Sequence, residues 1–330
     1  MGESFQAMVI REVDGKPLAG FENLTLADLP DNDVLVEISH SSLNYKDGLA
    51  ITGKGRIARR MPMVAGIDLA GTVASSRDPA WKPGDAVIVN GWGLSETEWG
   101  AFTRFQRLKA GHLTRLPAGF SPAAAMAVGT AGYTAALCVL ALQDHGALAG
   151  GAGDILVTGA AGGVGSVAVA LLAALGHRVT ASTGRPQEEA FLTRLGAAAI
   201  LDRAELSEAG KPLQAERWSA AVDSVGSRTL ANVLAQLRYG GAAAACGLAQ
   251  GADLPATVLP HILRGVALLG VDSVMAPQSR RTRAWDFLDT HLDRARLAEL
   301  TVTAPMSELP ELAQKIVAGQ LRGRTVIEIG

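Results

Sequence analysis

From the start of the chain to about Ser121, short apolar runs alternate with turn residues. The clearest runs are Ala7–Arg11, Val34–Ser39, Asp68–Ser75 and Ala86–Asn90. Short runs of this kind, bounded by turn residues, are typical of antiparallel strands. We therefore predict a mostly antiparallel β-domain in this part of the chain.

After Ser121 the pattern changes to apolar helices that alternate with short buried strands. Two helices are predicted over Pro122–Met126 and Tyr133–Leu142. A strand at Asp154–Thr158 and a long helix at Val164–Leu175 follow. The next predicted elements continue the alternation: a strand at Arg178–Ser182, a helix at Gln187–Leu195, and strands at Ala199–Leu201, Ala220–Asp223, Ala242–Cys246 and Ala267–Val271. This order predicts a parallel sheet covered by helices.

Near the end of the chain the pattern returns to an isolated strand, Arg324–Ile329. We therefore predict an α/β protein with two domains, for which 330 residues are enough. An α/β domain, residues 122–262, is inserted between two pieces of a β-rich domain, residues 1–121 and 263–330.

Composition narrows the class of protein. Hydrophobic residues make up 48% and charged residues 19% of the chain, as in soluble proteins with a large core. A net charge of −2 predicts no attraction to nucleic acid or membranes. No secretion signal and no apolar run long enough to span a membrane are visible. With Cys138 and Cys246 interpreted as free buried thiols, we expect a cytoplasmic protein.

A glycine-rich segment, Gly159–Gly165, lies between a predicted strand and a predicted helix. Glycines allow a tight turn and a close approach of the backbone to a pyrophosphate. The helix N-terminus offers free N–H groups to the same anion. Because strand, loop, helix and second strand follow in this order, we expect a dinucleotide to bind here.

The end of the second strand of this domain indicates which dinucleotide binds. NAD enzymes usually place Asp or Glu there, on the ribose 2′-hydroxyl. This chain has Ser182, Thr183 and Arg185, with no acid before Glu188, and Arg203 follows the next strand. Hydroxyl and guanidinium groups bind a 2′-phosphate that a carboxylate would repel, so we predict NADPH as the cofactor. The alternative for Arg185 is a purely local turn contact.

No pattern of metal ligands is visible. The six histidines are scattered, neither cysteine neighbours one, and no Cys-x-x-Cys pair is present. We therefore expect no metal. Alcohol oxidation, in which a metal acidifies the hydroxyl, is then disfavoured, and reduction of a polarised carbon–carbon double bond is favoured.

Four segments resemble the zinc-free, quinone-oxidoreductase-like branch of the medium-chain dehydrogenase/reductase superfamily: 41–47 (SSLNYKD), 62–71 (PMVAGIDLAG), 129–134 (GTAGYT) and the glycine segment. Asn44–Gly53, Cys246–Ala249 and Gly270–Met275 are most similar to the acryloyl-CoA reductase subgroup. The resemblance covers essentially the whole chain. It implies a GroES-like β-rich catalytic domain, a Rossmann domain that binds NADPH, and a homodimer.

The resemblance also implies cofactor contacts at Tyr45, Gly162, Gly163, Val164, Gly165, Ser182, Thr183, Arg185, Arg203, Leu248, Ser273 and Arg324. The implied reaction is hydride transfer to the β-carbon of a small enoyl-CoA, most directly acryloyl-CoA, followed by protonation of the α-carbon. Tyr45 is the first candidate for a proton donor or enolate partner, and packing against nicotinamide is its alternative. Asn44 and Asp47 are expected to shape the pocket.

A CoA ester also needs cations for its phosphates. Two clusters are candidates: Lys54, Arg56, Arg59 and Arg60, and then Arg280, Arg281 and Arg283. Solvated loops are the alternative for both clusters. Two competing functions remain: an NADPH:quinone oxidoreductase, and a non-catalytic NADPH-binding protein.

Overall fold

The computed structural model describes residues 4–149 and 153–330. The chain divides into two compact units. Unit 1 comprises the chain up to Thr130, Ser273–Asp289 and Leu300–Gly330, and unit 2 comprises Ala131–Asp272 and Thr290–Glu299. These boundaries differ from the predicted ones at residues 121 and 262. The main reason is that the strand at 267–270 belongs to the sheet of unit 2.

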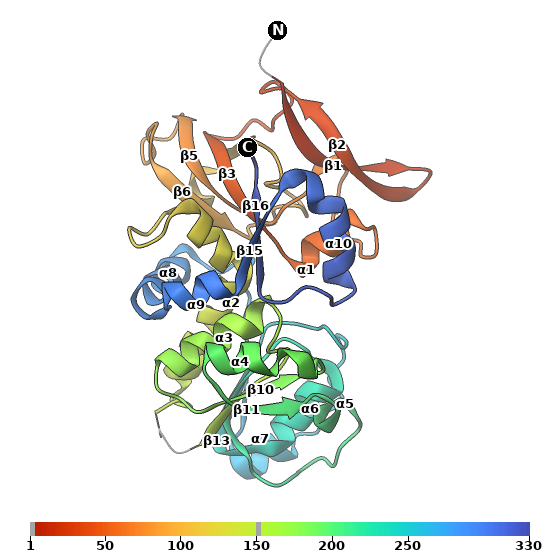
Figure 1. Ribbon diagram of the computed structural model, residues 1–330, viewed down its shortest axis with the longest axis vertical. Helices are drawn as coiled ribbons and strands as arrows, with labels where there is room; N and C mark the ends of the chain where they lie inside the picture. Colours follow the sequence, from red (N-terminus) through yellow and green to blue (C-terminus); the bar gives the residue numbers. More distant parts are fainter. Residues whose placement is uncertain (1–3, 150–152) are drawn as a thin grey trace. The chain divides into compact units, whose positions relative to one another are not determined.

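Unit 1 is built mostly from antiparallel strands, as the short apolar runs predict (Figure 1). Its strands, within the described residues, are β1 (Phe5–Val13), β2 (Lys16–Leu24), β3 (Val34–Leu43), β4 (Met63–Val64), β5 (Asp68–Ser76), β6 (Ala86–Asn90), β7 (Phe105–Leu108), β8 (Thr114–Arg115), β15 (Thr301–Pro305) and β16 (Arg324–Glu328). The larger sheet has the order β15-β16-β3-β5-β6-β8, and β7 also pairs with β3. A smaller sheet has the order β2-β1-β4. Pairing of β16 with β3 joins the two ends of the sequence.

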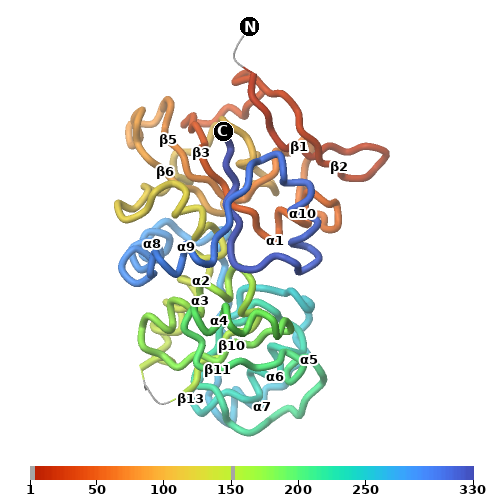
Figure 2. The backbone as a smooth tube through the Cα atoms, viewed as in Figure 1, coloured from red at the N-terminus to blue at the C-terminus, as the bar shows by residue number. Residues whose placement is uncertain are grey.

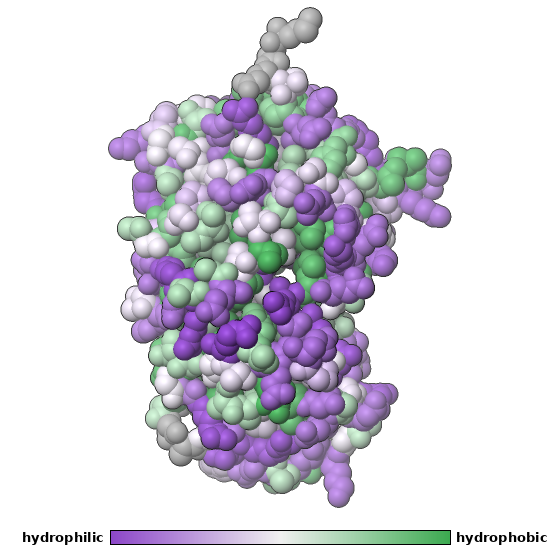
Figure 3. All heavy atoms as spheres, viewed as in Figure 1, coloured by the Kyte–Doolittle hydropathy of each residue, from purple (hydrophilic) through white to green (hydrophobic). Residues whose placement is uncertain are grey.

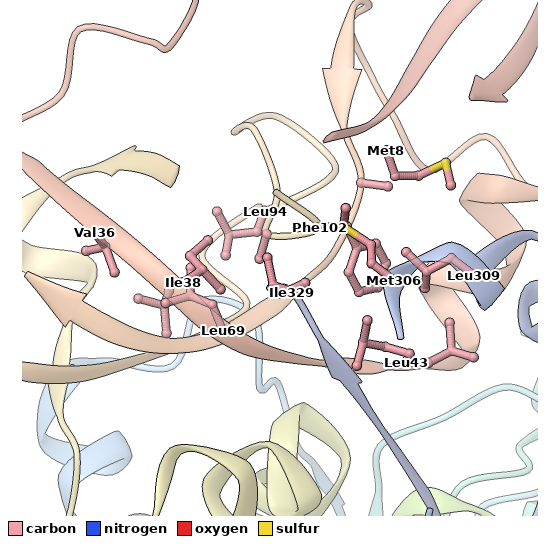
Figure 4. Packing of buried hydrophobic residues seen from close by; sticks show 14 of the residues in the cluster. Met8, Val36, Ile38, Leu43, Leu69, Leu94, Phe102, Met306, Leu309 and Ile329 are labelled. Atoms are coloured by element: carbon pink, nitrogen blue, oxygen red, sulfur yellow. The ribbon is translucent and has the colours of Figure 1, made fainter. Parts of the chain in front are cut away.

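The core of unit 1 lies among these strands and the helix that begins at Leu309. Met8, Ile38, Leu69, Phe102 and Leu309 are fully buried in it (Figure 4). Successive strand residues point to opposite faces, so alternate apolar positions of each strand reach this core. Full burial of such a side chain contributes about 1.5–3 kcal/mol. The core therefore fixes the positions of the strand ends, which carry the polar residues described below.

The part of unit 2 within residues 153–272 contains a six-stranded parallel sheet. Its strands are β9 (Asp154–Val157), β10 (Val179–Thr183), β11 (Ala197–Asp202), β12 (Trp218–Asp223), β13 (Leu237–Ala245) and β14 (Ala267–Gly270), in the order β11-β10-β9-β12-β13-β14. This is the Rossmann order, in which ligands bind beyond the carboxyl ends of the strands where the order reverses. Here the order reverses between β9 and β12. The predicted Rossmann fold is confirmed.

Helices cover the sheets of both units, and Figure 2 traces their path. Those of the described residues are α1 (Tyr45–Ile51), α2 (Pro122–His145), α3 (Gly163–Ala174), α4 (Glu189–Leu195), α5 (Ala204–Ser207), α6 (Ser227–Gln236), α7 (Leu259–Arg264), α8 (Gln278–His291), α9 (Arg294–Glu299) and α10 (Leu309–Val317). The two helices predicted at 122–126 and 133–142 form one run, α2, with a non-helical Gly129 inside it.

The helix α2 is long and apolar enough to cross a membrane, but 94% of its apolar window is buried inside the fold. It is therefore a core helix. The face drawn in Figure 3 mixes hydrophilic with hydrophobic side chains, as the surfaces of soluble proteins do. Both observations support a soluble protein.

Candidate functional site

In unit 2 the glycine loop, Gly159–Gly165, connects the carboxyl end of β9 to the N-terminus of α3. Gly159 has a left-handed φ of +59°, and a Cβ there would lie 2.6 Å from Ser224 Oγ. A Cβ on Gly165 would collide with the Gly159 backbone. Only glycine fits both positions. The first N–H groups of α3 have no partner within the helix, so the loop presents an anion-binding site.

Asp223, the last residue of β12, holds this loop in place. The Thr158 hydroxyl donates a hydrogen bond of 2.6 Å to Asp223 Oδ1, and the Gly226 N–H donates one of 2.8 Å to Oδ2. The Ser224 hydroxyl donates to the Thr158 carbonyl at 3.2 Å. Burial raises the pKa of the Asp223 carboxyl, and the hydrogen bonds that it accepts from Thr158 and Gly226 oppose that rise.

Asp223 was missed by sequence reasoning, because its partner Thr158 lies far from it in the chain. One signal could have found it. An acid that ends a buried strand beside the point where the strand order reverses lies next to the cofactor loop in a Rossmann sheet.

The end of β10 carries the residues predicted to select NADPH. Ser182 and Thr183 are its last two residues, and both are buried. The Arg185 guanidinium donates to a backbone carbonyl of the glycine loop at 3.1 Å. The Arg203 guanidinium lies over Gly184, where any side chain would collide with it. The fold thus brings two hydroxyls and two guanidinium groups to one strand end.

In unit 1 a buried polar network surrounds Asp68, the first residue of β5. The Ser42 N–H donates to Asp68 Oδ1 at 2.9 Å, and the Ser42 hydroxyl donates to Oδ2 at 2.7 Å. Asn44 Nδ2 donates to Oδ2 at 3.1 Å, and the Thr130 N–H at 2.7 Å. The Asp68 network, as we call it, consists of Ser42, Asn44, Asp47, Asp68, Thr130 and Arg324. Its members come from elements that are distant in sequence.

Arg324, the first residue of β16, supplies the cation of this network. Its guanidinium donates to the Ser42 hydroxyl at 2.7 Å, to Asn44 Oδ1 at 3.3 Å and to the Ala127 carbonyl at 2.9 Å. The side chain is only 2% exposed. Burial lowers the pKa of Arg324, while the carboxyls of Asp68 and Asp47 raise it. Because an arginine keeps its charge in proteins, the network contains a buried cation that must be neutralised.

Gly129 explains why α2 is interrupted. Its φ is +53°, and a Cβ there would lie 3.0 Å from Asp68 Oδ2 and would collide with the Arg324 guanidinium. A second helical segment begins after the interruption, and the Thr130 N–H at its start donates to Asp68 Oδ2. One glycine therefore provides both the room for the cation and a new helix N-terminus that faces the carboxylate.

Asp47, in the first turn of α1, is fully buried. Its Oδ2 accepts the Asn44 N–H at 2.9 Å, in a capping box that fixes the start of the helix. Its Oδ1 has no hydrogen-bond partner in the part of the chain that the structure describes. Burial, helped by the nearby Asp68 carboxyl, raises the pKa of Asp47 to about 8. The carboxyl is therefore mostly protonated at neutral pH.

Two of the residues predicted to contact the cofactor lie at the surface. Tyr45, the first residue of α1, is 49% exposed, and Leu248, after β13, is 64% exposed. The capping box between Asn44 and Asp47 flanks Tyr45 in the sequence, so it fixes the start of the helix that carries this half-exposed side chain and its phenol hydroxyl. Such a hydroxyl can donate a proton to a bound molecule.

The structure corrects the expectation that Arg281 binds a CoA phosphate. Its side chain is 2% exposed, and it donates to the backbone carbonyls of Val274 at 2.7 Å and Ala276 at 2.8 Å. Its guanidinium lies 4.1 Å from the centre of the Trp92 ring. The sequence showed a cluster of positive charges, but not that the side chain of Arg281 on α8 is buried in the fold. Arg281 instead holds the segment that contains Ser273, a predicted cofactor contact.

The loop after α1 keeps its cations at the surface. Arg56, Arg59 and Arg60 are all exposed. Arg60 lies 3.9 Å from Glu98, which also pairs with Lys109 at 2.7 Å. Weak, exposed pairs of this kind leave the loop able to meet a phosphate.

Two family descriptions match the chain: an alcohol dehydrogenase GroES-like domain at residues 30–140, and a zinc-binding dehydrogenase at residues 163–290. The residues of this chain do not fit the zinc that the second name implies. Among residues 4–149 and 153–330, no three His, Cys, Asp or Glu side chains are grouped so that they could hold a metal ion. The carboxyl groups of Asp47 and Asp68 are the nearest approach to a pair of metal ligands, but the Arg324 guanidinium already supplies a cation beside them.

Full-length relatives are similar throughout. The chain is 49% identical over 328 residues to the acrylyl-CoA reductase AcuI of Ruegeria pomeroyi, covering 98% of this chain and 99% of the relative. It is 38% identical over 333 residues to the putative quinone oxidoreductase YhfP of Bacillus subtilis, covering 100% of both. The crystal structure of the yhdH oxidoreductase from Salmonella enterica in complex with NADP has 48% identity and a TM-score of 0.96, covering 98% of this chain and 100% of that one. The chain therefore belongs to the medium-chain dehydrogenase/reductase superfamily and is one of its oxidoreductases.

Proposed function

We propose that this protein uses NADPH to reduce the carbon–carbon double bond of a short enoyl-CoA, most directly acryloyl-CoA to propanoyl-CoA, without a metal. The observation that carries the proposal is the 49% identity to an acrylyl-CoA reductase over 98% of the chain. The reduction adds a hydride to the β-carbon and a proton to the α-carbon of the enoyl group.

The proposed cofactor site is the glycine loop with the end of β10. Backbone N–H groups of Gly162–Gly165 bind the pyrophosphate. Ser182, Thr183, Arg185 and Arg203 bind the ribose 2′-phosphate through charge-assisted hydrogen bonds. When bound, NADPH supplies the hydride.

Four further residues are proposed to serve the cofactor. Tyr45, Leu248 and Ser273 contact it directly. Arg324 is 2% exposed, and its hydrogen bonds go to Ser42, Asn44 and Ala127, so its part is to hold the Asp68 network.

The hydroxyl of Tyr45, whose side chain is half exposed, is the proposed partner of the reacting enoyl group. It donates either the α-proton or a hydrogen bond to the enolate oxygen. Asn44 and Asp47 position it, because their capping box fixes the first turn of α1. The exposed guanidinium groups of Arg56, Arg59 and Arg60 are proposed to meet CoA phosphates.

An NADPH-oxidation assay with acryloyl-CoA, crotonyl-CoA and a quinone tests the proposal. We expect turnover of a short enoyl-CoA that survives exhaustive chelation. Turnover of the quinone alone would favour the second candidate, an NADPH:quinone oxidoreductase, which the 38% identity to a putative quinone oxidoreductase supports. Binding of NADPH without any turnover would indicate a non-catalytic protein.

We also propose that the protein is cytoplasmic and forms a homodimer. An edge strand, β14, ends the unit 2 sheet, and Val258, Ile262 and Leu263 near it are 65%, 69% and 56% exposed. An edge strand beside exposed apolar side chains favours pairing with a second copy. Sedimentation analysis should show a dimer that Ile262→Glu weakens. A wild-type monomer would contradict the proposal.

A further inference from the structure

A groove of about 750 Å³ lies in unit 1, between the β1–β2 hairpin, the end of α1 and α10. Figures 1 and 2 both draw α1 and α10 side by side next to this hairpin. Apolar side chains of Ile51, Pro310 and Ala318 line part of the groove, and Lys54 and Lys315 add two cations. Its volume falls within the roughly 300–1,000 Å³ of small-molecule sites.

One face of α1 leads from the groove to Tyr45. Tyr45, Leu49 and Thr52 are spaced four and three residues apart, so they lie on the same side of the helix. All three are at least partly exposed, whereas Asp47 and Gly48 are buried. Thr52 itself lines the groove.

The length of this face suits one kind of ligand. At 1.5 Å per residue, the path from Tyr45 to Thr52 is roughly 10 Å. The pantetheine arm of a CoA thioester is longer than this. An acyl group at Tyr45 therefore allows the nucleotide end of the same molecule to reach the groove.

The charges of the groove also suit a phosphorylated ligand. Lys315 Nζ lies 2.6 Å from Glu311 Oε1, and these side chains are 44% and 69% exposed. An exposed ion pair one helical turn apart contributes little to stability, so Lys315 can exchange the carboxylate for a phosphate. Lys54, on the other wall, is exposed and adjoins the cationic loop that contains Arg56.

We propose that this groove binds the 3′-phosphoadenosine diphosphate end of the CoA thioester whose acyl group is reduced at Tyr45. The apolar wall contacts the adenosine, and Lys54 and Lys315 contact its phosphates. The proposal rests on the proposed function, since it assigns a place to the part of the substrate that does not react.

The test compares two substrates of the full-length protein: acryloyl-CoA and acryloyl-pantetheine, which has the same acyl group and arm but no nucleotide. In the double variant Lys54→Gln/Lys315→Gln, the KM for acryloyl-CoA should rise roughly three- to tenfold, as expected for exposed charge contacts. The kcat, and the KM for acryloyl-pantetheine, should not change. The matched control is Lys16→Gln/Lys82→Gln, two exposed lysines of unit 1 outside the groove, which should leave both KM values unchanged.

A second variant should act in the opposite direction. Glu311→Gln removes the carboxylate that competes for Lys315, so it should lower the KM for acryloyl-CoA only. Equal effects on both substrates, or none in either variant, would overturn the groove proposal while leaving the reductase function intact. If the wild type reduced neither ester, the proposed function itself would fail, and the groove proposal with it.

Discussion

The glycine loop of unit 2 is the proposed site of a bound anion, and the Asp68 network of unit 1 holds a buried cation, and the two are assembled in different ways. The loop is one continuous segment, Gly159–Gly165, and the groups proposed to bind the anion are its backbone N–H groups. The network consists largely of side chains, and its Ser42–Arg324 hydrogen bond joins residues 282 positions apart. The loop is therefore a local structure, and the network exists only in the folded chain.

This difference determines which substitutions each region tolerates. A backbone site tolerates changes of neighbouring side chains but not an added Cβ at its glycines. The network depends on each side chain, because loss of one partner leaves a buried charge uncompensated.

Gly129→Ala is the strongest way to break the network. The backbone at this position has a φ of +53°, which alanine rarely adopts, and the added Cβ collides with the Arg324 guanidinium. The free energy of unfolding should therefore fall by about 3 kcal/mol or more. Gly146→Ala is the control, because its φ is +88° and no described atom lies within 4 Å of the new Cβ. That variant should lose only about 1–2 kcal/mol for its backbone conformation. Equal losses on chemical denaturation would show that the collision is unimportant.

Tyr45→Phe tests the role of the Tyr45 hydroxyl, which Asn44 and Asp47 of the network are proposed to position. The ring is kept and the hydroxyl is removed, so kcat for acryloyl-CoA should fall on the order of 10²-fold if the hydroxyl donates a proton. NADPH binding should be nearly unchanged because the ring that is proposed to contact the cofactor is kept, and stability should be nearly unchanged because Tyr45 is half exposed. Steady-state kinetics and fluorescence titration measure the two effects. A variant with full kcat would mean that the proton comes from water or another group.

Arg185→Ala addresses the cofactor side of the comparison. Loss of one charged hydrogen bond to the 2′-phosphate should weaken NADPH binding by about 1.5–3 kcal/mol. NADH has no 2′-phosphate, so its affinity should change little. Calorimetric titration of both cofactors measures the difference. Equal affinity of the wild type for NADPH and NADH would refute this role of the β10 end.

Asp47→Asn removes a titrating group from the Asp68 network while keeping a side chain of nearly the same shape. In the folded protein the pKa of Asp47 is raised from 3.8 to about 8. The folded state thus holds this proton more tightly than the unfolded chain does, and the resulting stability is lost as the pH rises from about 4 through 8. The slope is at most about 1.4 kcal/mol per pH unit, and Asn, which does not titrate, should abolish this contribution. The unfolding free energies of the two proteins should be most similar near pH 4 and should diverge as the pH rises toward 8, because only the wild type loses stability. Parallel curves would contradict the assignment.

The smallest expected effect concerns the exposed arginines. Neutralising Arg56, Arg59 and Arg60 together should raise the KM for acryloyl-CoA by less than about tenfold, because exposed charge contacts are weak. The KM for small quinones should be unaffected, since they carry no phosphate.

Arg281→Gln is the contrasting variant. It should lower the free energy of unfolding, because the Arg281 guanidinium is buried against backbone carbonyls. An Arg281 variant of normal stability would contradict its structural role.

Much of unit 2 could be predicted from the sequence. The order of strands and helices, the position of the glycine loop and the absence of an acid between Thr183 and Glu188 are all properties of short continuous segments. Each depends on backbone conformation or on one local residue type, which sequence records directly. Asp223 escaped prediction because its partner is Thr158, which directly follows β9, a strand that is distant in the sequence and adjacent only in space.

In unit 1 the sequence by itself indicated a β-rich domain, the motif Asn44–Asp47 and the presence of Arg281 and Arg324 as cations. Only the tertiary structure decided that Arg281 points inward and that burial raises the pKa of Asp47 to about 8. It also decided that Arg324 meets Ser42 across the whole length of the chain. The physical reason is that burial and charge depend on neighbours, and for these residues the neighbours are brought together by packing of the strands rather than by position in the sequence.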